Sequence, residues 1–134
     1  MTQVIKNKKG VTLVELLAVV VILGIIAAIA VPTIGGLISR QRQRAAEATY
    51  DTIVEASKLY AQDVTGRFTL EALETNDFID LKSNTFSYGP DADNLTDADK
   101  DEIFVEVSGN NVTFFTVSTG GTAVVLWING YKVN

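Results

Sequence analysis

A run of 21 residues, from Val11 to Val31, constrains this chain more than any other feature of its sequence. The run is apolar almost throughout, and Glu15 is its only ionisable side chain. As an α-helix it would be about 30 Å long, which matches the hydrocarbon core of a bilayer. The sequence therefore predicts a helix that spans a membrane.

Basic residues flank this run on both sides. Three lysines precede it, Lys6, Lys8 and Lys9, and three arginines follow it, Arg40, Arg42 and Arg44. The lysines favour a cytoplasmic N-terminus, and the arginines weaken that preference without reversing it. A secretory signal peptide is the alternative, because Ala28-Ile29-Ala30 offers a small-residue cleavage site. The length of the run and the acid inside it favour a membrane anchor.

Glu15 is the most informative residue of the run, because a carboxylate at this depth costs about 2.5 to 3.5 kcal/mol on insertion scales unless something compensates it. Protonation, the membrane interface or another molecule could supply the compensation. If the chain were cut after Gly10, the new amino group of Val11 would lie one helical turn from Glu15. A neighbouring copy could then present its own amine to this carboxylate. The alternative is an acid that stays solvated or protonated near the membrane surface.

The first quarter of the chain contains Lys8-Lys9-Gly10, then the run Val11-Thr12-Leu13-Val14-Glu15-Leu16-Leu17, and Pro32 further along. In this combination it resembles type IV prepilins and the related pseudopilins. It implies that a prepilin peptidase cleaves after Gly10 and methylates the amino group of Val11. It also implies that Glu15 pairs with the N-terminus of a neighbouring subunit. Val11 departs from the phenylalanine that the family has most often at this position.

The same resemblance implies a function and a location. The implied function is that of a structural subunit of a type IV pilus-like filament, and a pseudopilin of a type II secretion or competence (DNA-uptake) machine is the close alternative. The precursor would cross the cytoplasmic (inner) membrane once before it joins an extracellular or cell-surface filament. The implied partners are further copies of the chain, minor pilins, the prepilin peptidase and a pilus assembly platform.

Composition limits the other functions. The chain contains neither cysteine nor histidine, and its net charge is -5. It therefore lacks the commonest general base, the commonest metal ligand and any thiolate nucleophile, so neither an enzyme nor a cofactor is expected. Direct binding of nucleic acid is not expected either, because phosphate binding needs a basic surface. A membrane-anchored monomeric binding module is the alternative from another class, and it leaves Glu15 unexplained. Many pilins of Gram-negative bacteria have a cysteine pair that this chain lacks, so the resemblance favours a Gram-positive or otherwise atypical host.

Gly24 and Pro32 mark a stretch where the predicted helix is weak. Glycine loosens a helix, and proline removes a backbone hydrogen bond. In related filaments this stretch resembles a segment that loses helical order under load. A simple bend of a continuous helix at Pro32 is the alternative.

The rest of the chain predicts an α+β fold, in which one long N-terminal helix packs on a small antiparallel, pilin-like sheet of three or four strands. Apolar residues recur at helical spacing up to Tyr60, so the helix is expected to end near Gly66. A second, short helix is expected at 69–75, capped by Thr69. Segments rich in β-branched and aromatic residues predict strands at 103–107, 112–117 and 122–128. The expected parts are a leader at 1–10, a membrane or filament-core helix at 11–32, its amphipathic continuation at 33–66 and a globular region at 67–134.

Charged residues on the continued helix form a basic row and an acidic row. Arg40 and Arg44 share a face, and Glu47, Asp51 and Glu55 follow along the helix. Copies stacked with an axial offset could bring the basic row of one against the acidic row of the next. The alternative is a solvated face with arginines near lipid headgroups.

Two further features allow either a structural or a ligand-binding interpretation. Asp97, Asp99 and Asp101 alternate as calcium ligands do, but the loop fails the EF-hand pattern, and a capping box from Thr96 to Asp99 with one helical turn fits as well. The aromatic residues are predicted to belong to the core or to a sheet face, with a ligand role for the tryptophan as the alternative: Phe104, Phe114, Trp127 and Tyr131.

Overall fold

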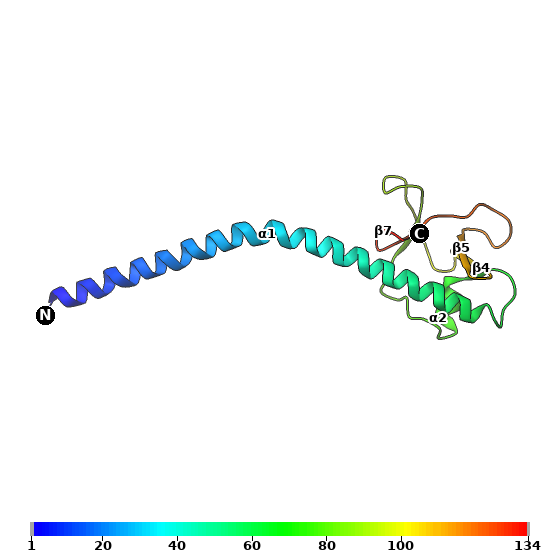
Figure 1. Cartoon of the computed structure of the whole chain (residues 1–134), viewed down its shortest axis with the longest axis horizontal. Coiled ribbons are helices and arrows are strands. Elements are labelled where there is room, and N and C mark those ends of the chain that lie inside the picture. Colours follow the sequence, from blue (N-terminus) through cyan, green and yellow to red (C-terminus); the bar gives the residue numbers. More distant parts are fainter. Residues whose placement is uncertain (1, 134) are drawn as a thin grey trace. The chain divides into compact units, whose positions relative to one another are not determined.

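The computed structural model describes the backbone of residues 2–133 and the side chains of residues 12–133. One helix, α1 (Thr2–Tyr60), contributes to two compact units. The N-terminal unit is Met1–Arg40, and the C-terminal unit is Gln41–Asn134. Each unit is described by itself (Figure 1).

The described part of the N-terminal unit is helix α1 throughout, including the positions of Gly24 and Pro32. Its large apolar side chains are exposed: Leu13 is 69% exposed and Val31 is 70% exposed. The C-terminal unit therefore contains the hydrophobic core of the described chain.

The C-terminal unit joins the rest of α1 to a short helix and two antiparallel sheets (Figure 1). The short helix is α2 (Leu70–Thr75). The first sheet has the order β1-β4-β5, with the strands β1 (Phe68–Thr69), β4 (Phe104–Ser108) and β5 (Asn111–Phe115). The second has the order β3-β2-β6-β7, with the strands β2 (Phe86–Tyr88), β3 (Thr96–Ala98), β6 (Leu126–Ile128) and β7 (Tyr131–Lys132).

The core of this unit forms where α1 meets the strands. Ile53 of α1 is fully buried, and the ring of Tyr50 lies 5.8 Å from the ring of Phe114 on β5. The ring of Tyr60 at the end of α1 lies 4.9 Å from that of Phe68 on β1. Other fully buried apolar side chains come from α2, the strands and the segments between them: Leu70, Leu73, Leu81, Ile103, Val105, Leu126 and Ile128. The predicted α+β class, a long helix packed on small antiparallel sheets, is confirmed.

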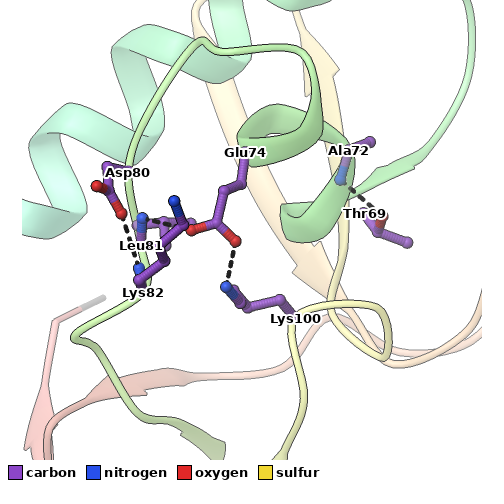
Figure 2. Close-up of polar contacts among 7 residues, drawn as sticks. All are labelled: Thr69, Ala72, Glu74, Asp80, Leu81, Lys82 and Lys100. Atoms are coloured by element: carbon purple, nitrogen blue, oxygen red, sulfur yellow. Dashed lines mark hydrogen bonds and ion pairs between the residues drawn. The ribbon is translucent and has the colours of Figure 1, made fainter.

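The predicted cap of the short helix is confirmed as well. Thr69 has an extended backbone, and its hydroxyl accepts the backbone N–H of Ala72 at 3.1 Å (Figure 2). The helix ends at Thr75.

Three local predictions differ from the structure. Helix α1 ends at Tyr60 instead of near Gly66, because the next turn tightens into i→i−3 hydrogen bonds and Tyr60 packs against Phe68. The strand expected at 122–128 is confined to β6, which pairs with β2 and not with β5, so there are two sheets instead of one. The helical turn expected from Thr96 is wrong, because Thr96–Ala98 is strand β3, paired with β2.

A polar cluster around Glu74 ties α2 to two loops (Figure 2). The carboxylate of Glu74 forms an ion pair with Lys100 and accepts the backbone N–H of Leu81 at 3.0 Å. The hydrogen bond from Lys100, and then that from Leu81, lowers the pKa of Glu74 below its ordinary value of 4.5. Nothing in the spacing of these residues along the chain predicted this contact.

Candidate functional site

The candidate site is the surface of helix α1, beginning with its apolar N-terminal part. Large apolar side chains on all sides of the helix are exposed between Leu13 and Ile38. By length and composition α1 can span a membrane. This surface is suited to a lipid environment or to the sides of other apolar helices.

Glu15 lies on this surface, and its side chain is exposed. No ion pair or hydrogen bond joins it to another residue whose side chain the structure describes. A lone carboxylate inside a membrane costs up to about 3.5 kcal/mol on insertion scales, and no described residue of the chain offsets this cost for Glu15.

Gly10 and Val11, the residues of the predicted cleavage site, lie outside the residues whose side chains the structure describes. Their backbone lies within α1. Cleavage and methylation at these two residues remain predictions.

The weak stretch of α1 extends beyond Pro32. Because Pro32 has no N–H, the carbonyl of Ala28 lacks its usual helical donor. The hydroxyl of Thr33 bonds to the carbonyl of Ile29 at 3.0 Å, a contact that bends and slightly destabilises helices. Gly35 and Gly36 follow, and a Cβ built on either meets nothing within 4 Å.

The sequence analysis missed Gly35 and Gly36, although the glycine pair is plain in the chain. Each glycine costs about 1 kcal/mol relative to alanine in a helix, and no close contact inside the described chain requires either of them. Residues 32–36 are thus the least stable turn of α1 on intrinsic grounds. Gly24, in contrast, is a single glycine among large apolar residues of the same helix.

The charged residues of α1 lie where the sequence placed them, on the exposed side of the helix. Arg40, Arg44, Glu47, Asp51 and Glu55 are all exposed. Glu47 accepts a hydrogen bond from Gln43 at 2.8 Å, and Glu55 lies 3.3 Å from Lys58.

The aspartates of the calcium hypothesis are not brought together. Asp97 is on strand β3 opposite Ser87, whereas Asp99 and Asp101 lie in the turn that follows. No group of three or more acidic side chains that could hold a metal ion occurs among the described residues. The N–H of Asp99 donates instead to the carboxylate of Glu102 at 3.1 Å.

Trp127 belongs to the core, as predicted. It is 8% exposed, and its indole N–H donates to the carbonyl of Gly89 at 3.1 Å. Phe114 is fully buried, whereas Phe104 and Tyr131 are half-buried.

Arg67 is a structural residue that the sequence analysis did not single out. Its Nε donates to Glu106 at 2.6 Å, and its Nη1 donates to the carbonyls of Val117 and Gly120. Its guanidinium lies 3.3 Å above the ring of Phe115. Arg67 thereby holds the loop after β5 against the sheet. The chain has no cysteine, so no disulfide can hold this loop.

Comparison with known protein families places one motif on this helix. Residues 5–31 match the family described as the prokaryotic N-terminal methylation motif. The motif is typical of type IV pilins and pseudopilins, which are structural subunits and not enzymes. It implies processing by a prepilin peptidase and polymerisation, and together with the apolar α1 it is consistent with a membrane-anchored prepilin. No curated protein and no solved structure matches the chain.

Proposed function

We propose that the chain is the precursor of a subunit of a type IV pilus-like filament. The observation that carries the proposal is the methylation motif at residues 5–31 on a helix whose apolar surface is exposed on all sides. Such a surface needs lipid before assembly and neighbouring helices after it. A pseudopilin of a secretion or DNA-uptake machine is the variant that shares all these features.

Processing is the first step of this function. The prepilin peptidase cleaves between Gly10 and Val11 on the cytoplasmic side and methylates the new amino group of Val11. The cut removes a basic leader and places an amino group one turn from Glu15. The mature subunit stays in the membrane through its apolar helix until it assembles.

Assembly is driven by packing of the apolar helices and by the contact of Glu15 with a neighbour's terminal amine. The lack of a described partner for Glu15 within its own chain supports this contact. Gly24 and Pro32 let the helix adjust as subunits pack. Arg40, Arg44, Glu47 and Asp51 contribute contacts between subunits further along the helix.

The test combines mass spectrometry of the mature N-terminus with isolation of sheared filaments. We expect a chain that starts at methylated Val11. A retained leader, or a chain that starts at Val31, contradicts the proposal.

A charge-removing variant tests the assembly step. Glu15→Gln keeps the size of the side chain and should be inserted and cleaved, but it should enter filaments poorly. Leu16→Ala is the matched control, because it alters the neighbouring position and leaves the acid in place. Normal polymerisation of correctly processed Glu15→Gln would refute the role of the carboxylate.

A further inference from the structure

The turn between strands β6 and β7 contains the chain's one Asn-Gly dipeptide, Asn129-Gly130. The backbone angle φ is 52° at Asn129 and 80° at Gly130, so the two residues form the tight turn of a β-hairpin. Both are exposed to solvent. Asparagine is a thermolabile residue, and a following glycine makes it most reactive, because glycine has no Cβ to hinder attack by its own backbone nitrogen.

The reaction open to this dipeptide is deamidation, and water is its only co-reactant. The backbone nitrogen of Gly130 loses its proton and forms a bond to Cγ of Asn129, the bond from Cγ to Nδ2 breaks, and ammonia leaves. Water then opens the cyclic imide at either of its carbonyl carbons. One opening gives aspartate, and the other gives isoaspartate, in which the main chain runs through the side-chain carboxyl and is longer by one carbon.

The folded chain holds the side chain of Asn129 in place through the segment before strand β2. Its Oδ1 accepts the backbone N–H of Thr85 at 2.9 Å and the hydroxyl of Thr85 at 3.3 Å. Its Nδ2 donates to Oδ1 of Asn84 at 2.9 Å. The backbone N–H of Asn129 also donates to the carbonyl of Thr85 at 2.9 Å. Cyclisation turns the amide plane and expels Nδ2, so it has to disrupt the three side-chain bonds.

The strength of these bonds sets the expected protection. A hydrogen bond of ordinary net strength favours the bonded arrangement about fivefold over the open one. Three such bonds lower the population of the reactive arrangement about a hundredfold. When the hairpin opens, this protection is lost, and Asn129 reacts as it would in an unfolded chain.

Isoaspartate at position 129 would disturb the contact between β7 and helix α1. The turn pairs Ile128 with Tyr131, and a longer main chain inside the turn shifts that register. Strand β7 has only two residues, so the turn is what fixes its position. The carbonyl of Lys132 on β7 accepts the side-chain amide of Gln43 on α1 at 3.1 Å. A shifted register therefore also separates β7 from the helix.

We propose that Asn129-Gly130 is a site of spontaneous deamidation that is blocked while the β6–β7 hairpin is closed and is released when the hairpin opens. A chain that opens is then marked irreversibly, because hydrolysis of the imide does not restore asparagine. The isoaspartate form refolds without the native pairing of β7. This proposal does not depend on whether the chain forms filaments.

Peptide mapping by mass spectrometry tests the block in the full chain, in detergent micelles at mildly alkaline pH. Folded samples are compared with samples unfolded in guanidinium chloride, and the fluorescence of Trp127 verifies the state of each. We expect the peptide that contains Asn129 to be converted about a hundredfold more slowly in the folded chain. Equal rates in the two states would overturn the proposal.

Two variants test the hydrogen bonds themselves. Asn84→Ala removes the acceptor of Nδ2, and Thr85→Val removes the hydroxyl but keeps the backbone N–H. Each should speed the conversion of the folded chain about fivefold and leave the rate in guanidinium chloride unchanged. Ser83→Ala is the matched control, because Ser83 is exposed beside Asn84 and is not a partner of Asn129. If both variants convert at the rate of the control, the hydrogen bonds do not block the reaction and the proposal is wrong.

An aged sample tests the consequence for the fold. A chain that is unfolded, left to convert and then refolded should melt at a lower temperature than one refolded at once, with Trp127 as the probe. Asn129→Asp taken through the same treatment is the control, because it carries the aspartate product and ages equally at every other asparagine. Identical melting of the aged chain and the chain refolded at once would show that the modification does not disturb β7.

Discussion

Replacing Ile53 tests whether helix α1 is the central core element of the C-terminal unit. Ile53 is fully buried and lies in one cluster with Phe114 and Leu126. Truncation of a buried isoleucine to alanine costs about 2 to 5 kcal/mol, since it removes apolar contacts and leaves a cavity. For a domain of this size, each kcal/mol lowers Tm by about 4 to 8 °C. Ile53→Ala should therefore lower Tm by at least about 8 °C, and Ile53→Val by less.

The assay uses the full chain in detergent micelles and the fluorescence of Trp127. Trp127 is the only tryptophan, and it is buried on β6, so its emission reports unfolding of the sheet and not of the micelle-bound helix. Leu59→Ala is the matched control, because Leu59 is on the same helix but is 56% exposed. It should change stability by no more than about 0.5 kcal/mol. Equal melting of Ile53→Ala and Leu59→Ala would show that the sheets fold without the helix.

Three further predictions concern Glu74, Arg67 and the glycine pair of α1. The lowered pKa of Glu74 means that its contribution to stability is present above its unfolded pKa and is lost as the pH falls through its folded pKa. Glu74→Gln should thus melt below the unaltered chain at pH 7, and the gap should close below about pH 4.5 in thermal scans. Arg67→Lys keeps the charge but loses the planar fork, so urea denaturation should show a loss of about 1 to 3 kcal/mol; unchanged stability would show that the contacts of Arg67 are dispensable. Gly35→Ala and Gly36→Ala should each stabilise the helix by about 1 kcal/mol, seen as slower amide hydrogen exchange at residues 32–36 in micelles, and unchanged exchange would show that this turn is not weak.

The parts of this fold that were predictable from the sequence are those that depend on residues close together in the chain. The apolar run, the helical spacing up to Tyr60 and the cap at Thr69 each depend on residues a few positions apart, so the chain displays them directly. Strand β4 and strand β5 were also visible, because a glycine turn at Gly109 joins two β-branched segments.

The division into two sheets was not predictable in this way. Strand β2 has only three residues, and it pairs with β6, about 40 positions later in the chain, through Phe86 and Ile128. Strand β3 follows an exposed acidic loop and carries polar residues, so its composition resembles a capped turn more than a strand. Pairing of strands so far apart in the chain depends on burial in the folded core, and the β-propensity of a short segment does not predict that burial.

The candidate site shows the same division between local and distant information. Glu15 stands out because it interrupts an apolar run, and the arginines and acids of α1 stand out by their helical spacing. That Glu15, Arg40, Arg44 and Asp51 form no ion pair with another described residue could be established only from the folded chain, since any distant lysine or aspartate could have folded against them. The ion pair between Glu74 and Lys100, 26 residues apart, is such a case.

The exposure of side chains changes along α1, and this change determines which surroundings each part of the helix needs. From Gln41 onward the helix is buried on one side, and the chain's own sheets cover that side. Between Leu13 and Ile38 it is exposed and apolar all round, so only lipid or several other helices can surround it. At the centre of a bilayer a charged side chain costs about 2.5 to 3.5 kcal/mol on insertion scales, and the proposed contact with a neighbour's amine would remove the smaller cost that Glu15 carries nearer the end of the apolar run. Under the proposed function, Glu15 would therefore favour the transfer of this helix from the bilayer into an assembly of copies.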